Sequence, residues 1–182
     1  RRKRRVEEQR RFAKAHRLQL VLCDGKHFRA GPRRARRVAL FFLDDATRFV
    51  PEVVVGTAES AELFLRGLHR LLRAIGRVDA MYVDHGSGFT AHDSRDVLAN
   101  LGIAHILGLE GYPQARGKVE RFNRTADADL LRHLDNDEVD PDCGALELRI
   151  AHYLGSDYNV RRHESLDQSP RACFLADERP LE

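Results

Sequence analysis

The order of short apolar runs and helical repeats is the feature of this sequence that most constrains its fold. Residues 18–23, 38–43 and 49–55 are compact runs rich in Leu, Val and Phe, which predict three β-strands. The basic segment 29–37, with Gly31 and Pro32 as its turn signal, and the short segment 44–48 are suited to join these strands as hairpins. The first third of the chain therefore predicts an antiparallel part of a sheet.

Helical and extended patterns alternate in the rest of the chain. Residues 58–75 repeat apolar side chains at spacings of three and four, and we expect Thr57 to cap this helix and Gly76 to end it. Residues 80–83 and 103–107 predict two more strands, and residues 94–101, 117–134 and 145–158 predict three more helices. This order predicts an α/β protein with a five-stranded mixed sheet flanked by helices, the arrangement of the ribonuclease-H-like fold. A fold alone does not establish function.

Length and charge indicate how the chain is organised. A chain of 182 residues with 42% hydrophobic residues is sufficient for one ordinary domain with a core. The net charge of +3 is unevenly divided, because residues 1–37 carry 15 Lys and Arg against 3 Asp and Glu. We expect a basic N-terminal helical arm at residues 1–17, a core at 18–175 and a C-terminal tail at 176–182. Such an arm is typical of a chain that binds a polyanion, but a solvated helix face has the same composition.

Cysteine usage and hydropathy indicate the compartment. The three cysteines are far apart and form no CxxC pair, which argues against disulfides or a zinc site and for a reducing compartment. No apolar run approaches the roughly 20 residues that span a bilayer, and no signal peptide opens the chain. We expect a cytoplasmic location and no membrane partner. Because the chain does not begin with Met, we interpret it as a piece of a longer protein.

Three acidic residues stand where an open sheet would bring them together. Asp24 and Asp84 follow the first and fourth predicted strands, and Glu120 falls in the first turn of the helix predicted at 117–134. Strand ends of this kind point into the ligand crevice, and carboxylates suit the two hard cations of phosphodiester chemistry. The 35 residues between Asp84 and Glu120 prove little, because 16 Asp and 12 Glu give roughly one such pair by chance. A solvated acid is the alternative for each residue.

Five stretches of the chain carry a family resemblance. In order they are LVLCDGKHF, LFFLDDATRFV, YVDHGSGFT, GYPQARGKVERFNRT and YNVRRHESLDQSP. Together they resemble the integrase core of bacterial insertion-sequence DDE transposases, in the retroviral-integrase superfamily, over residues 18–175. The most specific piece, residues 117–124, is similar to the helix around the family's catalytic Glu. The resemblance implies that Asp24, Asp84 and Glu120 hold two Mg²⁺ or Mn²⁺ ions, and that Asp45, Thr47 and Arg48 are mainly structural.

The implied function is that of a DNA transposase or integrase catalytic domain. Such a domain cleaves phosphodiester bonds and transfers a 3′-hydroxyl end on double-stranded DNA, at transposon ends and target. Because transposition joins two ends, we expect a homo-oligomer, associated with the nucleoid. A catalytically inactive, decayed DNA-binding or assembly module of the same fold is one alternative. A ribonuclease-H-like nuclease is another, but that class typically uses four carboxylates and the sequence offers no convincing fourth.

The sequence departs from the family pattern at several positions. His85 stands where the family usually has Asn, Gly88 where a larger residue is usual, and Lys26 where Thr is common. Ala115 and Arg162 replace a common Gly and Pro. Lys26 is placed to pair with Asp24 in the absence of metal, and His85 to reach the site. For His27, which resembles a family His, contact with DNA or the metal shell and a structural hydrogen bond remain equal alternatives.

Basic and amide side chains beside the acids are candidates for DNA contact. Residues four before, three after and four after Glu120 share its helix face, and such groups contact phosphates or form surface salt bridges. Arg121 is expected to point away. The predicted DNA contacts are Arg116, Lys118, Asn123 and Arg124 on the helix, Tyr112 and Gln114 before it, and Arg33, Arg34, Arg36 and Arg37 in the basic hairpin.

Overall fold

The sheet has the five strands that the sequence predicts. The structure is a computed structural model and describes residues 13–84, 86, 89, 91–108, 113–136 and 143–181, without the side chains of residues 113–115. The sheet order is β3-β2-β1-β4-β5, with antiparallel pairing among β1, β2 and β3 and parallel pairing of β4 with β1 and β5. The strands are β1 (Val21–Ala30), β2 (Ala35–Asp44), β3 (Glu52–Gly56), β4 (Ala80–Val83) and β5 (Ala104–Leu107).

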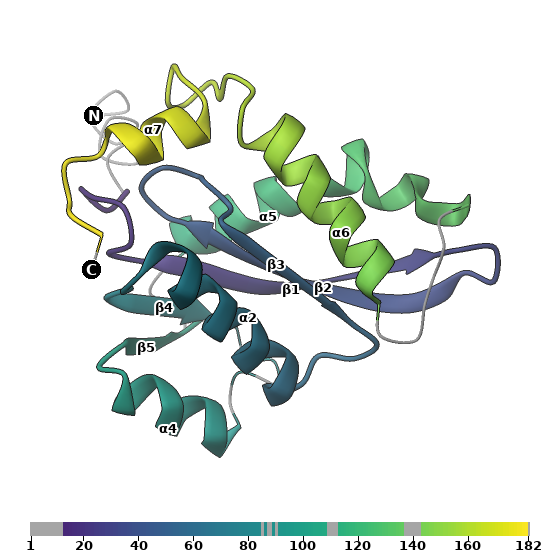
Figure 1. The fold of residues 1–182 in the computed structure, drawn as a ribbon, viewed down its shortest axis with the longest axis horizontal. Coiled ribbons are helices and arrows are strands. Elements are labelled where there is room, and N and C mark those ends of the chain that lie inside the picture. Colours follow the sequence, from purple (N-terminus) through teal and green to yellow (C-terminus); the bar gives the residue numbers. More distant parts are fainter. Residues whose placement is uncertain are drawn as a thin grey trace.

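Helices cover both faces of this sheet (Figure 1). One apolar cluster joins the sheet to α5 (Pro113–Asp129), the 3-10 helix Leu131–Asn136, α6 (Gly144–Tyr153) and the π-helix Leu154–Tyr158. A second cluster joins the other face to α2 (Ala61–Ile75), α4 (His92–Asn100) and α7 (Pro170–Ala176). The mixed five-stranded sheet flanked by helices is therefore confirmed, and its core lies on both sides of the sheet.

Strand β1 is longer than its apolar run predicts. It does not end at Asp24 but continues to Ala30, because residues 24–30 pair with β2 in a hairpin that extends beyond the rest of the sheet. Pairing with β4 covers only residues 21–23 of β1. Asp24 therefore lies inside a strand, directly after the last residue that pairs with β4.

Helix boundaries differ from the predicted ones in ways that the local chemistry explains. Helix α2 begins later, because Ser60 and not Thr57 caps it by accepting a hydrogen bond from the amide of Leu63 at 3.2 Å. Gly76 ends it as predicted, in a positive-φ conformation (82°) that glycine adopts readily. Helix α5 begins at Pro113, so Glu120 lies in its third turn and not its first.

Two observations concern the ends of the chain. The predicted arm lies mostly outside the described residues, and the part within them, residues 13–17, is not helical. Helix α7 was not predicted, although Ser169 followed by Pro170 is a typical helix start. Buried Arg17 donates from Nη1 to the carbonyl oxygen of Phe174 at 2.6 Å. This hydrogen bond holds α7 against the residues that precede β1.

Other expectations concern cysteines and the membrane. Cys23 and Cys143 are buried and Cys173 is half-buried, and all three are free thiols. None of the helices in the described ranges is long and apolar enough to cross a membrane.

Asp44 closes the turn between β2 and β3. Its carboxylate is completely buried and accepts hydrogen bonds from the amide of Leu18 at 2.8 Å and from the amide and hydroxyl of Thr47 at 2.9 and 2.6 Å. Asp45 likewise accepts from the amide of Lys14 at 2.8 Å. Both residues are the backbone-bonded turn acids that the sequence predicts.

We predict that Asp44→Ala lowers the free energy of unfolding by about 2–4 kcal/mol, because three buried donors lose their acceptor. Urea denaturation measures this change. Asp93→Ala, which removes an exposed acid from α4, is the control and should change stability by less than about 1 kcal/mol. Equal effects of the two substitutions would show that the Asp44 hydrogen bonds do not stabilise the turn.

Candidate active site

The register of the central strands brings two aspartates together. Side chains alternate between the two faces of a strand, and Leu22 of β1 and Tyr82 of β4 belong to the cluster under α5. Asp24 and Asp84 come two residues later and face the same side. Because Cys23 pairs with Val83, the two aspartates lie next to each other where β1 and β4 separate.

Each aspartate is held by a hydrogen bond. Asn123 of α5 donates from Nδ2 to Oδ2 of Asp24 at 2.7 Å, and the amide of Gly86 donates to Oδ1 of Asp84 at 2.8 Å. Burial raises the pKa of Asp24, and the neighbouring charge of Asp84 raises it further, while the hydrogen bond from Asn123 partly offsets the change. Two acids that repel each other in this way favour a bound cation.

Glu120 lines the same cavity but is turned toward another partner. The cavity has a volume of about 430 Å³, and Oε1 of Glu120 lies 3.0 Å from Nε of Arg116, one helical turn earlier. The Glu120 side chain is 58% exposed. Within the described ranges, no three His, Cys, Asp or Glu side chains are close enough together to hold a metal ion. The structure thus brings together Asp24 and Asp84, and leaves Glu120 at the rim, paired with Arg116.

The groups present in this cavity fit a hard divalent cation. Asp24 and Asp84 supply carboxylate oxygens, the donors that Mg²⁺ and Mn²⁺ prefer. Oδ1 of Asn123 is buried and has no hydrogen-bond partner among the described residues, although the Nδ2 of the same side chain is bound to Asp24. A buried oxygen without a donor, beside two repelling carboxylates, is consistent with a site that a cation completes.

A fourth acid, Glu59, borders the site and was not predicted. Its side chain is 14% exposed, and its carboxylate lies so close to Gly25 and Gly86 that a Cβ atom at either glycine would collide with it. Burial raises the pKa of Glu59, followed by the charge of Asp84. Glu59 comes just before the cap of α2, a position where acids are common, so the sequence contains no signal that distinguishes it.

Two residues near the site have partners other than those expected. Lys26 does not pair with Asp24, because its Nζ lies 3.5 Å from Oδ1 of Asp127 on the facing helix. His27 is 70% exposed, and its Nε2 lies 4.0 Å from Oε2 of Glu59. His27 therefore lies at the edge of the acidic group, exposed to solvent and beside Glu59.

The predicted DNA contacts divide among several places. Arg116 lines the cavity that holds Asp24 and Asp84, Asn123 is bound to Asp24, and Arg124 is exposed on α5. Lys118 lies on another face of α5, paired with the buried Asp45. Tyr112, His85 and Gly88, and the side chains of Gln114 and Ala115, lie outside the described residues.

The basic hairpin forms a separate surface. Its turn begins at residue 31, seven residues beyond Asp24 along β1, which corresponds to roughly 20 Å in a strand. Arg33 and Arg36 are exposed, Arg34 pairs with Asp135, and Arg37 donates from Nη1 to the Arg36 carbonyl oxygen at 2.8 Å. Any DNA contact by these side chains is therefore at a distance from the acids.

Solved structures share this fold. The catalytic core domain of BIV integrase superposes with a TM-score of 0.67 at 23% identity, covering 87% of this chain and 94% of that one. The HTLV-2 integrase catalytic core domain, in complex with magnesium in a trimeric form, gives a TM-score of 0.69 at 15% identity, covering 88% and 98%. These similarities establish the ribonuclease-H-like fold.

Similar sequences identify the family. The transposase for transposon Tn552 of Staphylococcus aureus is 31% identical over 102 residues, which are 52% of this chain and 21% of the transposase. The Gag-Pol polyprotein of Rous sarcoma virus subgroup B (strain Schmidt-Ruppin) is 43% identical over 53 residues, 29% of this chain and 3% of the polyprotein. The chain thus spans about a fifth or less of the length of these relatives.

The family described as "Integrase core domain" matches residues 14–113, which include Asp24 and Asp84 and end before Glu120. The chain belongs to this family and is a catalytic core of the DDE transposase and integrase type.

Proposed function

We propose that this chain cleaves DNA phosphodiester bonds and transfers a 3′-hydroxyl end to target DNA, using two divalent ions held by Asp24, Asp84 and Glu120. The observation that carries the proposal is the side-by-side placement of Asp24 and Asp84, with Glu120 lining the same cavity. Mg²⁺ or Mn²⁺ bound there would neutralise the attacking and leaving oxygens of an in-line displacement.

The hydrogen bonds of the two aspartates orient them for this role. Asn123 is bound to Oδ2 of Asp24 and Gly86 to Oδ1 of Asp84, so both carboxylates are held in place at the cavity that a cation would occupy. Asn123 is therefore a positioning residue for Asp24 in this proposal, and its predicted DNA contact is not needed.

The ion pair between Arg116 and Glu120 can break so that each side chain takes another partner. Their ion pair is exposed, so separating the two side chains costs little. When Glu120 turns toward Asp24 and Asp84, the Arg116 guanidinium is released at the rim of the cavity. A guanidinium in that position suits a DNA phosphate, with which it forms charge-assisted hydrogen bonds.

Double-stranded DNA, as transposon ends and target, is the proposed partner. The similarity to a transposase and to retroviral integrase cores supports this choice. A homo-oligomer follows from the need to hold two DNA ends, and solved HTLV-2 integrase cores are described in trimeric and dimeric forms. We propose a cytoplasmic, nucleoid-associated location for a protein with this substrate.

A hydrolytic nuclease of the same fold is the second candidate, and Glu59 favours it. Enzymes of that group typically use four carboxylates, and Glu59 adds a fourth beside Asp24 and Asp84. Joining assays with a labelled 3′-hydroxyl end separate the two functions, because a nuclease cuts and does not join. Cutting without joining, abolished by Glu59→Gln, would support the nuclease.

We predict that Asp84→Asn removes Mg²⁺- or Mn²⁺-dependent nicking and joining by more than about a hundredfold, since losing a metal ligand exceeds the 10–100-fold effect of losing a supporting group. The wild type should also melt at a higher temperature with Mn²⁺, because the ion binds only the folded chain, and Asp84→Asn should not. Asp93→Asn is the charge-matched control and should behave as wild type. An active Asp84→Asn protein with an unchanged Mn²⁺ shift would refute the proposal.

We predict that Asp24→Asn raises the metal-free melting temperature at about pH 7, while still accepting a hydrogen bond from Asn123. The raised pKa of Asp24 means that its stabilising contribution is complete below about pH 3.9, the unfolded value, and is lost as pH rises through the folded pKa. The advantage of the variant should therefore shrink as pH falls toward about 4. Melting curves across this range measure the difference, and a difference independent of pH would contradict the prediction.

A further inference from the structure

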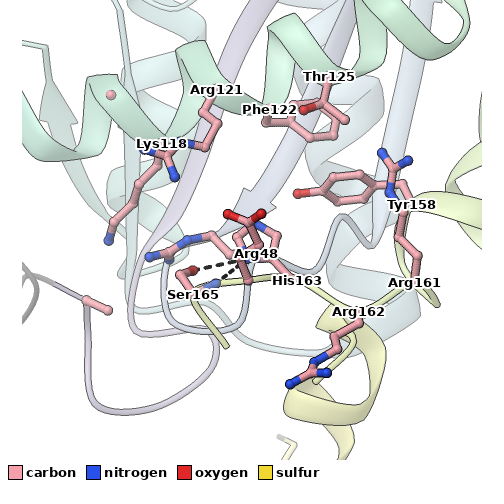
Figure 2. Close-up of a pocket in the computed structure, with 13 residues that line it drawn as sticks. Arg48, Lys118, Arg121, Phe122, Thr125, Tyr158, Arg161, Arg162, His163 and Ser165 are labelled. Carbon is pink, nitrogen blue, oxygen red and sulfur yellow. Dashed lines mark hydrogen bonds between the residues drawn. The ribbon is translucent and has the colours of Figure 1, made fainter. Parts of the chain in front are cut away.

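Helix α5 separates two cavities. Arg116, Val119 and Glu120 line the catalytic cavity on one face of the helix. Residues on the adjoining face line a second cavity of about 590 Å³, which Figure 2 shows between α5, the β2–β3 turn and the segment after the π-helix. The helix residues that line it are Gly117, Lys118, Arg121, Phe122 and Thr125.

The charged side chains that line the second cavity are mainly basic. Its lining includes five Lys or Arg side chains and one His, against one acid, Glu164. In Figure 2, Arg121 reaches from α5 toward Arg48, and His163 and Ser165 border the same space. The basic side chains are Arg48, Lys118, Arg121, Arg161, Arg162 and His163.

Three of these cations have acidic partners. Lys118 pairs with Asp45, Arg161 with Asp129 and Arg162 with Asp167. These three side chains are held in place by their own ion pairs.

Arg48 and Arg121 differ from the other three. Nη1 of Arg48 is buried without a hydrogen-bond partner in the described part of the chain. Asp44 and Asp45 are near Arg48, but their carboxylates accept hydrogen bonds from other groups. Arg121 is exposed and has no ion pair with any described residue.

The backbone of Arg48 adopts an unfavourable conformation. Its φ of 61° lies in the left-handed region, which is unfavourable for a residue with a long side chain. Strain of this kind together with an unsatisfied buried donor is typical of functional sites. Burial lowers the pKa of both Lys118 and His163, and the charge of Arg48 lowers it further, so an anion in the cavity would relieve this repulsion.

We infer that this second cavity binds a phosphate group, supplied by the backbone of the DNA strand that enters the catalytic cavity. Arg48 and Arg121 provide guanidinium donors, which match phosphate oxygens, and the hydroxyl groups of Thr125 and Tyr158 add neutral donors. The choice of DNA as the source rests on the proposed function.

The position of the cavity supports a backbone phosphate. A helix with its side chains is about 10–12 Å across, and a DNA strand carries one phosphate per 3.4 Å of helix axis. Both cavities border α5, so one DNA strand that passes beside this helix is long enough to reach both. The volume of about 590 Å³ accommodates a sugar and its phosphate and not only a free ion.

The test is Arg121→Glu, with Arg149→Glu as the control. Arg149 is an exposed Arg of α6, so both variants change the net charge equally and neither removes buried contacts. Fluorescence anisotropy with a labelled DNA duplex should show more than about tenfold weaker binding for Arg121→Glu and less than about twofold for Arg149→Glu, with the salt slope of Arg121→Glu reduced by about one. Equal weakening by both variants, or by neither, overturns the inference.

Pyrophosphate distinguishes the source of the phosphate. In the wild type it should raise the melting temperature and compete with DNA, and both effects should be lost in Arg121→Glu. Pyrophosphate binding that depends on Arg121 while DNA affinity does not would assign the cavity to a free phosphate compound and overturn the DNA source. A change in oligomeric state of Arg121→Glu, with unchanged binding of DNA and pyrophosphate, would assign it to an acidic segment of a second copy.

These results are independent of the catalytic proposal. Asp84→Asn should lose joining and keep both its DNA affinity and its response to pyrophosphate. If Arg121→Glu binds DNA like the control while Asp84→Asn still abolishes joining, phosphate binding in the second cavity is refuted and the catalytic assignment remains.

Discussion

The pairing of β1 with two different neighbours is the constraint on which the site depends. Residues 21–23 pair with β4, and the strand then continues beside β2 alone. At the point where β4 separates, Asp24 and Asp84 remain side by side with no further backbone pairing between them. The hydrogen bond from Asn123 to Asp24, at 2.7 Å, ties α5 to this point and so sets where Glu120 can reach. A one-residue shift in register would turn Asp24 to the opposite face of the sheet.

Helix α5 connects this arrangement to the rest of the molecule. Apolar residues such as Phe122 anchor it to the sheet, with the Phe122 ring 4.8 Å from that of Phe41 in an edge-to-face contact. The Lys118–Asp45 pair fixes the same helix to the β2–β3 turn. With the helix fixed, Asp24, Asp84 and Glu120 line the cavity on one side of it, and Arg48 and Arg121 line the cavity on the adjoining side. The proposed metal site beside a basic cavity is a charge arrangement that suits a polyanionic substrate with a reacting phosphate.

The sequence predicts those features that depend on local pattern. The apolar runs and helical repeats predict the order of the strands and helices. The residues around Asp24, Asp84 and Glu120 carry the family resemblance. Features that depend on contacts across the fold could not be predicted. Lys26 pairs with Asp127, about a hundred residues away, and Glu59 reaches the site only because Gly25 and Gly86 leave room for it. The extent of β1 was missed because residues 24–30 are too polar to resemble a strand and are held by hairpin pairing.

The most direct test of this account is a crystal structure with Mn²⁺, in which anomalous scattering locates the ion. We expect Mn²⁺ bound between Asp24 and Asp84, and Glu120 rotated away from Arg116 to join them. The hydrogen bond between Asn123 and Asp24 should remain. Mn²⁺ bound at another place, or a saturated site in which Glu120 stays paired with Arg116, would contradict the account.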